Sequence, residues 1–279
     1  MRAVPEPAFT RLSPANFTAE PLTVAAIAAA LGGLSKRFDV DVLAECDSTN
    51  TRLLMLAEAG APAGTVVAAE RQFAGRGRRG HSWLSSSNAS LTFSLLWRFA
   101  QDRALTGLSL AVGVALARAL ETLGIAGIRL KWPNDVLLHD GKLAGVLIEL
   151  VPGARPSAAV IGIGINLRLP EELPPEIRAT AAALADAGIS QPTPSGLLAQ
   201  VLVALHAALE CFAGQGFAGL RQDWLDRHAY AGQAVRLLSD YAVPLEGVCR
   251  GVDDDGALLL ETAAGIQRII SGEVSLRKA

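Results

Sequence analysis

The pattern of hydrophobic and polar positions through the middle of the chain predicts a sheet with helices packed against it. Short apolar runs, alternating or continuous, are typical of strands, and they occur at 38–46, 64–70, 91–99, 128–132, 134–138, 142–151 and 158–167. The turns Asp140-Gly141 and Pro152-Gly153 join the later runs. Because such turns connect neighbouring strands directly, the last four strands are expected to form an antiparallel meander.

Apolar residues at spacings of three and four positions predict helices between and after these strands. They cover 22–34, 104–123, 176–187, 194–212 and 217–228. A further helix is expected to begin at the capping residues Asp47, Ser48 and Thr49 and to end at Gly60. The helix at 104–123 is apolar enough along its length to be buried.

The composition changes near Gly232, where short strands and turns replace helices. This pattern predicts a small closed barrel over 232–279, after an α+β catalytic domain over 38–231. Residues 1–37 are expected to form an arm and a short helix. The arm is predicted to be loose because Pro5, Pro7, Pro14 and Pro21 interrupt it.

Charge and composition exclude several classes of partner. The chain of 279 residues has a formal net charge of −2, which gives no general attraction to nucleic acid or to anionic membranes. No apolar run is expected to reach membrane-spanning length, and no secretory signal is recognised, so a cytoplasmic protein is expected. Cys46, Cys211 and Cys249 are far apart in sequence, which argues against both a disulfide framework and a metal site.

The loop Gly75–Gly80 (GRGRRG) carries the strongest chemical indication. Its glycines let the backbone bend closely around a ligand, and the planar guanidinium groups of Arg76, Arg78 and Arg79 donate paired hydrogen bonds to carboxylate or phosphate oxygens. The loop therefore predicts anion binding. Its letters also match the GxGxxG turn of dinucleotide-binding folds, but a Ser- and Asn-rich segment follows where that fold needs a helix, so this alternative is disfavoured.

Three further segments combine charged, aromatic and small residues. They are Lys131–Asp135 (KWPND), Gly141–Gly145 (GKLAG) and Gly162–Asn166 (GIGIN). Glycines in the last of these would let a flat ring approach the strand backbone. Each segment also has a purely structural explanation: a core tryptophan followed by a turn, a hairpin strand, or a close strand crossing. Their occurrence together in one chain favours a shared site.

With Ser48–Asn50 (STN), these motifs and their order resemble those of the biotin protein ligases. The resemblance begins near Phe38 and extends more weakly into DDDGALLLE (253–261) and GEVSLR (272–277). It implies a catalytic domain related to class II aminoacyl-tRNA synthetases, with a mixed or antiparallel sheet and flanking helices, followed by an SH3-like barrel. It also implies that biotin and ATP with Mg²⁺ form biotinyl-AMP, and that a lysine of a biotin carboxyl carrier protein domain then accepts the biotinyl group.

The resemblance assigns roles to individual residues. Lys142, Arg78 and Asp135 are expected to act in catalysis, with Lys142 beside the biotin carboxylate and Asp135 placed to orient the incoming amine or to accept its proton. Biotin binding is expected from Ser48, Thr49, Asn50, Gln72, Arg76, Gly77, Arg78 and Lys142. Adenylate binding is expected from Arg76, Arg79, Trp83, Lys131, Asn134 and Asn166.

Two alternatives stay open: a lipoate ligase, which also makes an acyl adenylate, and a module that binds biotin or its adenylate without catalysis. KWPND and GRGRRG favour biotin, and the presence of Lys142 and Asp135 favours catalysis. Some biotin ligases also bind DNA through an N-terminal module. Residues 1–47 hold four Lys and Arg against six Asp and Glu, which favours a form without it. The sequence is compatible with a monomer or a homodimer.

Overall fold

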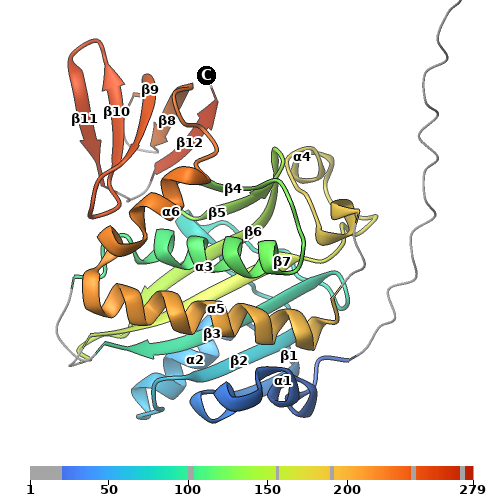
Figure 1. Ribbon diagram of the computed structural model, residues 1–279. Coiled ribbons are helices and arrows are strands. Elements are labelled where there is room, and N and C mark those ends of the chain that lie inside the picture. Colours follow the sequence, from blue (N-terminus) through green and yellow to red (C-terminus); the bar gives the residue numbers. More distant parts are fainter. Residues whose placement is uncertain are drawn as a thin grey trace, which may run out of the picture.

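Two sheets organise the protein in the computed structural model, which describes residues 21–99, 104–154, 157–188, 192–239, 243–270 and 274–278. The larger sheet lies in the middle of the molecule, and the smaller one lies beside it at the C-terminal end (Figure 1). Most of the expected N-terminal arm, and the first residues of GEVSLR, lie outside the described ranges.

The larger sheet has seven strands in the order β1-β2-β3-β7-β6-β5-β4. Their bounds are β1 Asp39–Cys46, β2 Thr65–Gln72, β3 Ser90–Arg98, β4 Ile128–Lys131, β5 Asp135–Leu138, β6 Gly141–Leu150 and β7 Ala158–Asn166. β1 and β2 are parallel, and the other neighbouring strands are antiparallel. The predicted meander from β4 to β7 is therefore confirmed, within a mixed sheet.

Helices cover both faces of this sheet. Side chains along a strand alternate between faces. In β2, Val66 and Ala68 join the core beneath α3 (Leu108–Thr122) and α5 (Pro194–Gln215), whereas Val67 packs with residues of α2 (Thr49–Glu58). Figure 1 shows α3 and α5 lying across one face. Eleven of the fifteen residues of α3 are buried, which confirms the burial predicted for it.

Shorter helices complete the layer. α1 (Val24–Leu31) packs against α5 and continues into the 3-10 helix η1 (Gly32–Arg37). The 3-10 helix η4 (Phe217–Leu220) and α6 (Arg221–Asp226) occupy most of the helical segment predicted at 217–228.

The prediction of a single helix over 176–187 is wrong. Only α4 (Pro175–Arg178) and the 3-10 helix η3 (Leu184–Ala187) form there. Between them the chain is extended along the start of β6, where Lys142 donates its backbone N–H to Thr180 O at 2.8 Å and accepts from the N–H of Ala182 at 2.9 Å. This pairing satisfies backbone groups that a helix would have used, so the tertiary contact overrides the helical preference of an alanine-rich segment.

α5 is long and apolar enough to cross a membrane, with a mean hydropathy of 1.7 over its most apolar window. The expectation that no segment reaches this length was therefore wrong. Half of that window is buried inside the protein, and the helix packs against α1 and α3. Burial in the core between other helices accounts for its apolar composition.

The smaller sheet contains β8 (Ala234–Ser239), β9 (Leu245–Val252), β10 (Leu258–Thr262), β11 (Gly265–Ile269) and β12 (Val274–Lys278). Its order is β11-β10-β9-β8-β12, and all of its pairs are antiparallel. The short strands predicted beyond Gly232 are confirmed. No pairing between β11 and β12 occurs among the described residues, so closure into a barrel stays a prediction.

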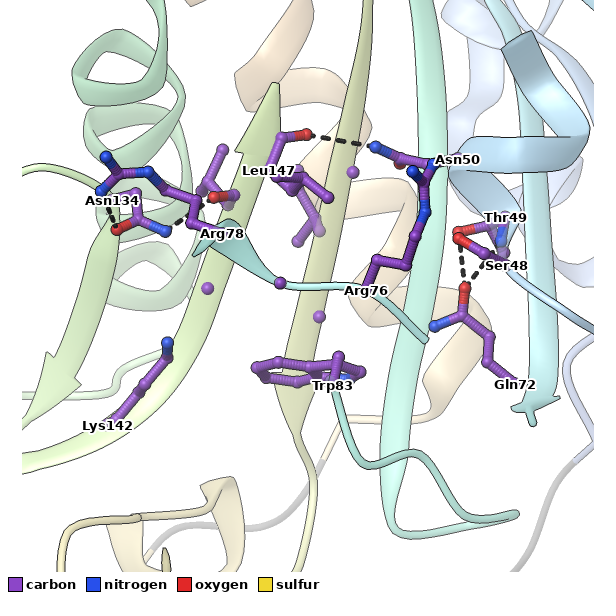
Figure 2. Close-up of a pocket in the computed structure, with 16 residues that line it drawn as sticks. Ser48, Thr49, Asn50, Gln72, Arg76, Arg78, Trp83, Asn134, Lys142 and Leu147 are labelled. Atoms are coloured by element: carbon purple, nitrogen blue, oxygen red, sulfur yellow. Dashed lines mark hydrogen bonds between the residues drawn. The ribbon is translucent and has the colours of Figure 1, made fainter. Parts of the chain in front are cut away.

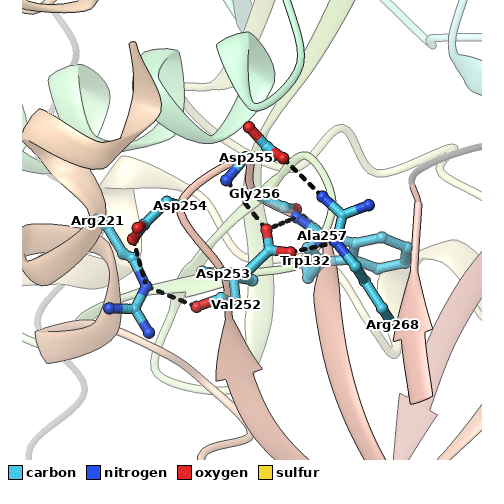
Figure 3. Close-up of polar contacts among 9 residues, drawn as sticks. All are labelled: Trp132, Arg221, Val252, Asp253, Asp254, Asp255, Gly256, Ala257 and Arg268. Carbon is cyan, nitrogen blue, oxygen red and sulfur yellow. Dashed lines mark hydrogen bonds and ion pairs between the residues drawn. The ribbon is translucent and has the colours of Figure 1, made fainter. Parts of the chain in front are cut away.

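The turn between β9 and β10 meets the larger sheet beside the KWPND segment (Figure 3). Trp132 is fully buried and donates from Nε1 to the carbonyl of Gly256 at 3.1 Å. Arg221 of α6 donates from Nε to the carbonyl of Val252 at 2.7 Å. The turn is further held by Arg268, which pairs with Asp253 and Asp255. The smaller sheet thus fixes the tryptophan of a segment that carries candidate site residues.

Candidate active site

One cavity brings together the three cations on which the expected chemistry depends. Arg76 and Arg78 reach it from the glycine-arginine loop and Lys142 from β6 (Figure 2). Its open space is about 60 Å³. Its lining residues are Ser48, Thr49, Asn50, Gln72, Arg76, Gly77, Arg78, Trp83, Asn134, Lys142, Gly145, Val146, Leu147, Gly162, Ile163 and Gly164. All the residues expected to bind biotin are therefore in this one cavity.

The N-terminus of α2 forms one wall. Ser48 is the N-cap residue, as predicted, but its side chain makes no capping hydrogen bond. Thr49 donates its backbone N–H to Gln72 Oε1 at 2.7 Å and its hydroxyl to the same oxygen at 3.1 Å. Both contacts occupy the amide oxygen of Gln72, so the amide nitrogen remains as its donor group. This wall is buried and polar, which suits a ligand that makes directional hydrogen bonds.

Asn50 connects this wall to the neighbouring strands. Its Oδ1 lies 2.5 Å from the hydroxyl of Ser94, and its Nδ2 donates to Glu149 Oε2 at 2.7 Å. A Cβ at Gly162 would lie 2.1 Å from Asn50 Oδ1, so this side chain can occupy its place only because residue 162 is glycine. Sequence reasoning missed Ser94 and Glu149, because neither is in a motif and only the strand register brings them here.

The glycine-arginine loop does not start a helix of the dinucleotide-binding kind. It contains only the short 3-10 helix η2 (Arg78–Gly80), with Arg79 at φ 58°, and then leads into β3. Two side chains attach the loop to the sheet: Arg76 donates to Glu149 Oε2 at 2.8 Å, and Arg78 donates to Asn134 Oδ1 at 3.3 Å. The loop therefore covers the cavity and directs two cations into it.

Lys131, Asp135 and Lys142 form an ion cluster beside the cavity. Asp135 Oδ1 lies 2.6 Å from Lys142 Nζ, and Oδ2 lies 3.2 Å from Lys131 Nζ. Burial raises the pKa of Asp135, but attraction and hydrogen bonds from the two lysines outweigh it and hold that pKa below its ordinary value. Burial lowers the pKa of Lys131, with Asp135 opposing the effect. Asp135 is thus a carboxylate at neutral pH.

The cavity has an excess of positive charge. Burial lowers the pKa of Arg78, with Asp135 opposing the effect, yet an arginine side chain stays protonated in proteins. In and beside the cavity are four cations and two carboxylates, which leaves a formal +2. The cations are Arg76, Arg78, Lys131 and Lys142, and the carboxylates are Asp135 and Glu149. The site is therefore prepared for anionic ligands although the whole chain carries −2.

Trp83 lies flat over the glycine-rich strands. A Cβ at Gly164 would lie 2.3 Å from its Cε2, and one at Gly145 would lie 3.4 Å from its Cζ3. Lys142 Nζ is 5.9 Å from the centre of its ring. The expectation that the glycines of the 162–166 strand admit a flat ring is thus met at Gly164 by a side chain of the protein itself, whereas the space at Gly162 is taken by Asn50. Its Nε1 is buried and has no hydrogen-bond partner among the described residues.

A larger groove of about 570 Å³ continues from the cavity and shares Gln72, Trp83 and Lys142 with it. Asn166, the last residue of β7, lines this groove. Its Nδ2 donates to the carbonyls of Lys142 and Ala182 at 3.1 and 3.0 Å. Lys142 is therefore at the junction of two compartments, and Asn166 fixes the backbone at that junction.

The remaining predicted residues lie around these two spaces. Arg79 lines a third space, which is formed by the loop itself together with Leu147 and Glu149. Lys131 and Asp135 are behind Lys142 and do not line the cavity. Among the residues that the structure describes, no group of three His, Cys, Asp or Glu side chains could hold a metal ion.

Comparison with known proteins finds two family matches along the chain. The Biotin/lipoate A/B protein ligase family matches residues 42–166, and the Biotin protein ligase C terminal domain matches residues 230–277. The chain is 39% identical to the bifunctional ligase/repressor BirA of Escherichia coli K12, over 86% of this chain and 74% of BirA. It is 36% identical to the biotin–[acetyl-CoA-carboxylase] ligase of Paracoccus denitrificans, over 84% of this chain and 98% of that protein.

Solved structures agree with the sequence relatives. The biotin protein ligase from Aquifex aeolicus in complex with biotin and ATP is similar with a TM-score of 0.74 and 33% identity, over 86% of this chain and 99% of that one. Both the fold and the matched segments thus point to one family. The chain belongs to the biotin/lipoate protein ligases and, within them, to the biotin protein ligases.

Proposed function

We propose that this protein uses ATP to attach biotin to a lysine of a biotin carboxyl carrier protein domain, through a biotinyl-AMP intermediate. The observation that carries the proposal is the position of Lys142, at the junction of a small polar cavity and a larger groove. A reaction that joins a carboxylate to a nucleotide needs two such compartments that meet at a cation. The complex of the Aquifex relative with biotin and ATP supports both substrates.

Biotin would bind in the small cavity. Its ureido ring accepts hydrogen bonds at its carbonyl and donates them from two N–H groups, and Ser48, Thr49, Asn50 and Gln72 offer both kinds of partner. Its carboxylate would lie toward Arg76, Arg78 and Lys142. The open space is small because Trp83 lies across the glycines, so we expect the ring of Trp83 to shift as ligands enter.

ATP would bind in the groove, with its α-phosphate at Lys142. Of the residues expected to bind the adenylate, Trp83 and Asn166 line this groove. Arg76 and Arg79 line a neighbouring space along the loop, and Lys131 lies behind Lys142, so they would add positive charge toward the phosphates when the loop closes over the nucleotide. Asn134 is held in place by its bonds to Arg78 and to the carbonyl of Val146. The indole of Trp83 offers a surface against which adenine can stack. Asn166 presents its amide oxygen, because both contacts of its nitrogen are to the backbone.

In the first step, an oxygen of the biotin carboxylate attacks the α-phosphorus, and pyrophosphate leaves with the electron pair of the broken P–O bond. Two anions must approach one another, so Arg78 and Lys142 would stabilise the charge on the transferring phosphoryl group. Mg²⁺ would enter with ATP, since the described residues form no metal cage and this ion is usually held by substrate phosphates. When bound, it supplies further charge neutralisation.

In the second step, the neutral amine of the carrier lysine attacks the anhydride carbonyl, and AMP leaves with the electron pair of the broken C–O bond. The proton released from the amine passes to the departing phosphate or to solvent. Asp135 would orient this amine as a charged acceptor, because its depressed pKa makes it a weak proton acceptor. The covering loop would keep water away from the anhydride until the carrier arrives.

The finer assignments belong to the same proposal. We propose that residues 38–231 form a catalytic domain of the class II aminoacyl-tRNA synthetase type, and that residues 232–279 form an SH3-like barrel. An enzyme that consumes ATP and modifies a carboxylase subunit would work in the cytoplasm, without nucleic acid or membrane partners, as a monomer or a homodimer.

Incubation of the full chain with biotin, Mg-ATP and a biotin carrier domain, followed by a streptavidin blot, tests the activity. We expect labelling that depends on ATP, that is lost in Lys142→Ala and that is retained in Lys36→Ala, an exposed lysine away from the site. A parallel reaction with lipoate and a lipoyl domain tests the lipoate alternative. Binding of biotin without transfer would favour the non-catalytic module and would overturn the proposal.

A further inference from the structure

Glu149 is the one carboxylate among the described residues that contacts both the covering loop and the buried wall of the cavity. Its Oε2 accepts from Arg76 at 2.8 Å and from Asn50 at 2.7 Å. Its side chain is 25% exposed, whereas that of Arg76 is 43% exposed. Two residues expected to bind biotin, far apart in sequence and on different elements, therefore share a single acceptor atom.

The strand register puts Glu149 in this place. It lies near the end of β6, two residues beyond Leu147, so both side chains project from the same face of the sheet. Leu147 also accepts from Asn50, through its backbone carbonyl at 3.4 Å. The end of β6 thus contacts the Asn50 amide twice.

We propose that Glu149 is a positioning residue for biotin binding. It holds the Arg76 side chain and orients the Asn50 amide, so that the loop and the cavity wall are correctly aligned when the loop closes. This inference rests on the proposed function. Glu149 itself is absent from the cavity lining, and it acts through the two side chains that it holds.

The contact with Arg76 is compatible with ligand binding. A guanidinium has five N–H donors, and the contact with Glu149 involves only one terminal nitrogen. The other N–H groups of the Arg76 guanidinium can face an anionic ligand while Glu149 fixes the plane of the guanidinium. A loop that is already held in place loses less conformational entropy when it closes on a ligand, so affinity rises.

The contact with Asn50 fixes the orientation of the Asn50 amide in the cavity wall. Ser94 contacts Oδ1 and Glu149 accepts from Nδ2, so only one of the two flipped orientations of the amide satisfies both partners. Asn50 is 3% exposed, where an unsatisfied amide is costly. Without Glu149, the amide could turn and present the wrong group to the cavity.

Three variants separate these effects. Glu149→Gln keeps an oxygen for Asn50 but removes the charge that attracts Arg76, and Glu149→Ala removes both. Glu246→Gln is the matched control, because Glu246 forms an ordinary exposed ion pair with Arg236 at 2.8 Å on the smaller sheet, and neither residue lines the cavity or the groove. Such pairs contribute little to stability or to positioning.

The readouts are hydrogen exchange of residues 74–82 without ligand, the KM for biotin, kcat, and the rate at which biotinyl-AMP leaves the enzyme. We expect Glu149→Gln to speed exchange in the loop and to raise the KM for biotin by about tenfold, with a smaller change in kcat. Glu149→Ala should have a larger effect on KM, and both variants should release the adenylate faster. Glu246→Gln should match the unsubstituted enzyme.

Loop exchange and biotin KM in Glu149→Gln that match the unsubstituted enzyme would overturn the proposal. An equal loss of kcat at unchanged KM would also overturn it, because that result indicates a part in the chemistry and not in positioning. If the unsubstituted chain transfers no biotin, the proposed function fails, and the exchange measurement still decides whether Glu149 holds the loop.

Discussion

Replacement of Trp132 by phenylalanine tests whether the smaller sheet positions the catalytic segment. Phenylalanine fills much of the same space but cannot donate to the carbonyl of Gly256, which then lies unsatisfied at a buried seam. An unpaired buried acceptor costs about 1–3 kcal/mol. The smaller ring leaves roughly 40 Å³ of space, which costs about 1 kcal/mol at ~24 cal/mol per Å³. The free energy of unfolding should therefore fall by about 2–4 kcal/mol.

The same substitution should weaken ATP binding. Trp132 lies between Lys131 and Asn134 in sequence, so a shift of its ring moves two residues expected to face the nucleotide. Urea unfolding measures the stability, and the rate of adenylate formation against ATP concentration measures the KM, which we expect to rise about fivefold. Trp97→Phe, on β3 and partly exposed, is the control. A Trp132→Phe variant with unchanged stability and unchanged KM for ATP would refute the reasoning.

Three further outcomes follow from the site. Arg78→Gly should release biotinyl-AMP early and label lysines on unrelated proteins, because Arg78 holds the loop to Asn134; unchanged adenylate retention in a filter-binding assay would contradict this. Gly164→Ala should displace the ring of Trp83, whose Cε2 would lie 2.3 Å from the new Cβ, and should lower biotin affinity in calorimetry. Burial lowers the pKa of His228 from 6.5 to about 4, so its contribution to stability is present above pH 6.5 and is lost as pH falls toward 4. The loss should reach about 3 kcal/mol, and His228→Gln should show less pH dependence over that range in urea unfolding.

The sheet could be predicted because each strand shows a pattern of polar and apolar residues that is typical of strands. Alternation in β1 and mostly apolar sequences in β3 and β7 reflect burial on one or both faces, and this burial is visible in the sequence. The helix predicted at 176–187 failed for the opposite reason. Its alanines favour a helix locally, but the extended pairing of this segment with Lys142 depends on a strand more than thirty residues away.

The residues of the candidate site also divide into those that the sequence could predict and those that it could not. The residues expected to bind biotin share one cavity because they belong to motifs in which glycine, arginine and lysine occur together. Ser94 and Glu149 have no such neighbours in sequence. Each enters the site by its position on β3 or β6, and a buried serine or a strand-end glutamate has many ordinary explanations. Their contacts in the folded protein distinguish them: both bind Asn50, and Glu149 also accepts from Arg76.

The electrostatics of the site required the structure for a related reason. A net charge of −2 correctly indicated that any positive region must be local, but sequence alone could not say how four cations stay close together without ligand. Asp135 bridges Lys131 and Lys142, and Glu149 pairs with Arg76. These carboxylates reduce the repulsion that would otherwise separate the cations, and the remaining formal +2 is available to two anionic substrates. A site built from the cations alone would bind anions more strongly but would be harder to fold, because its like charges would have no partners before the ligands arrive.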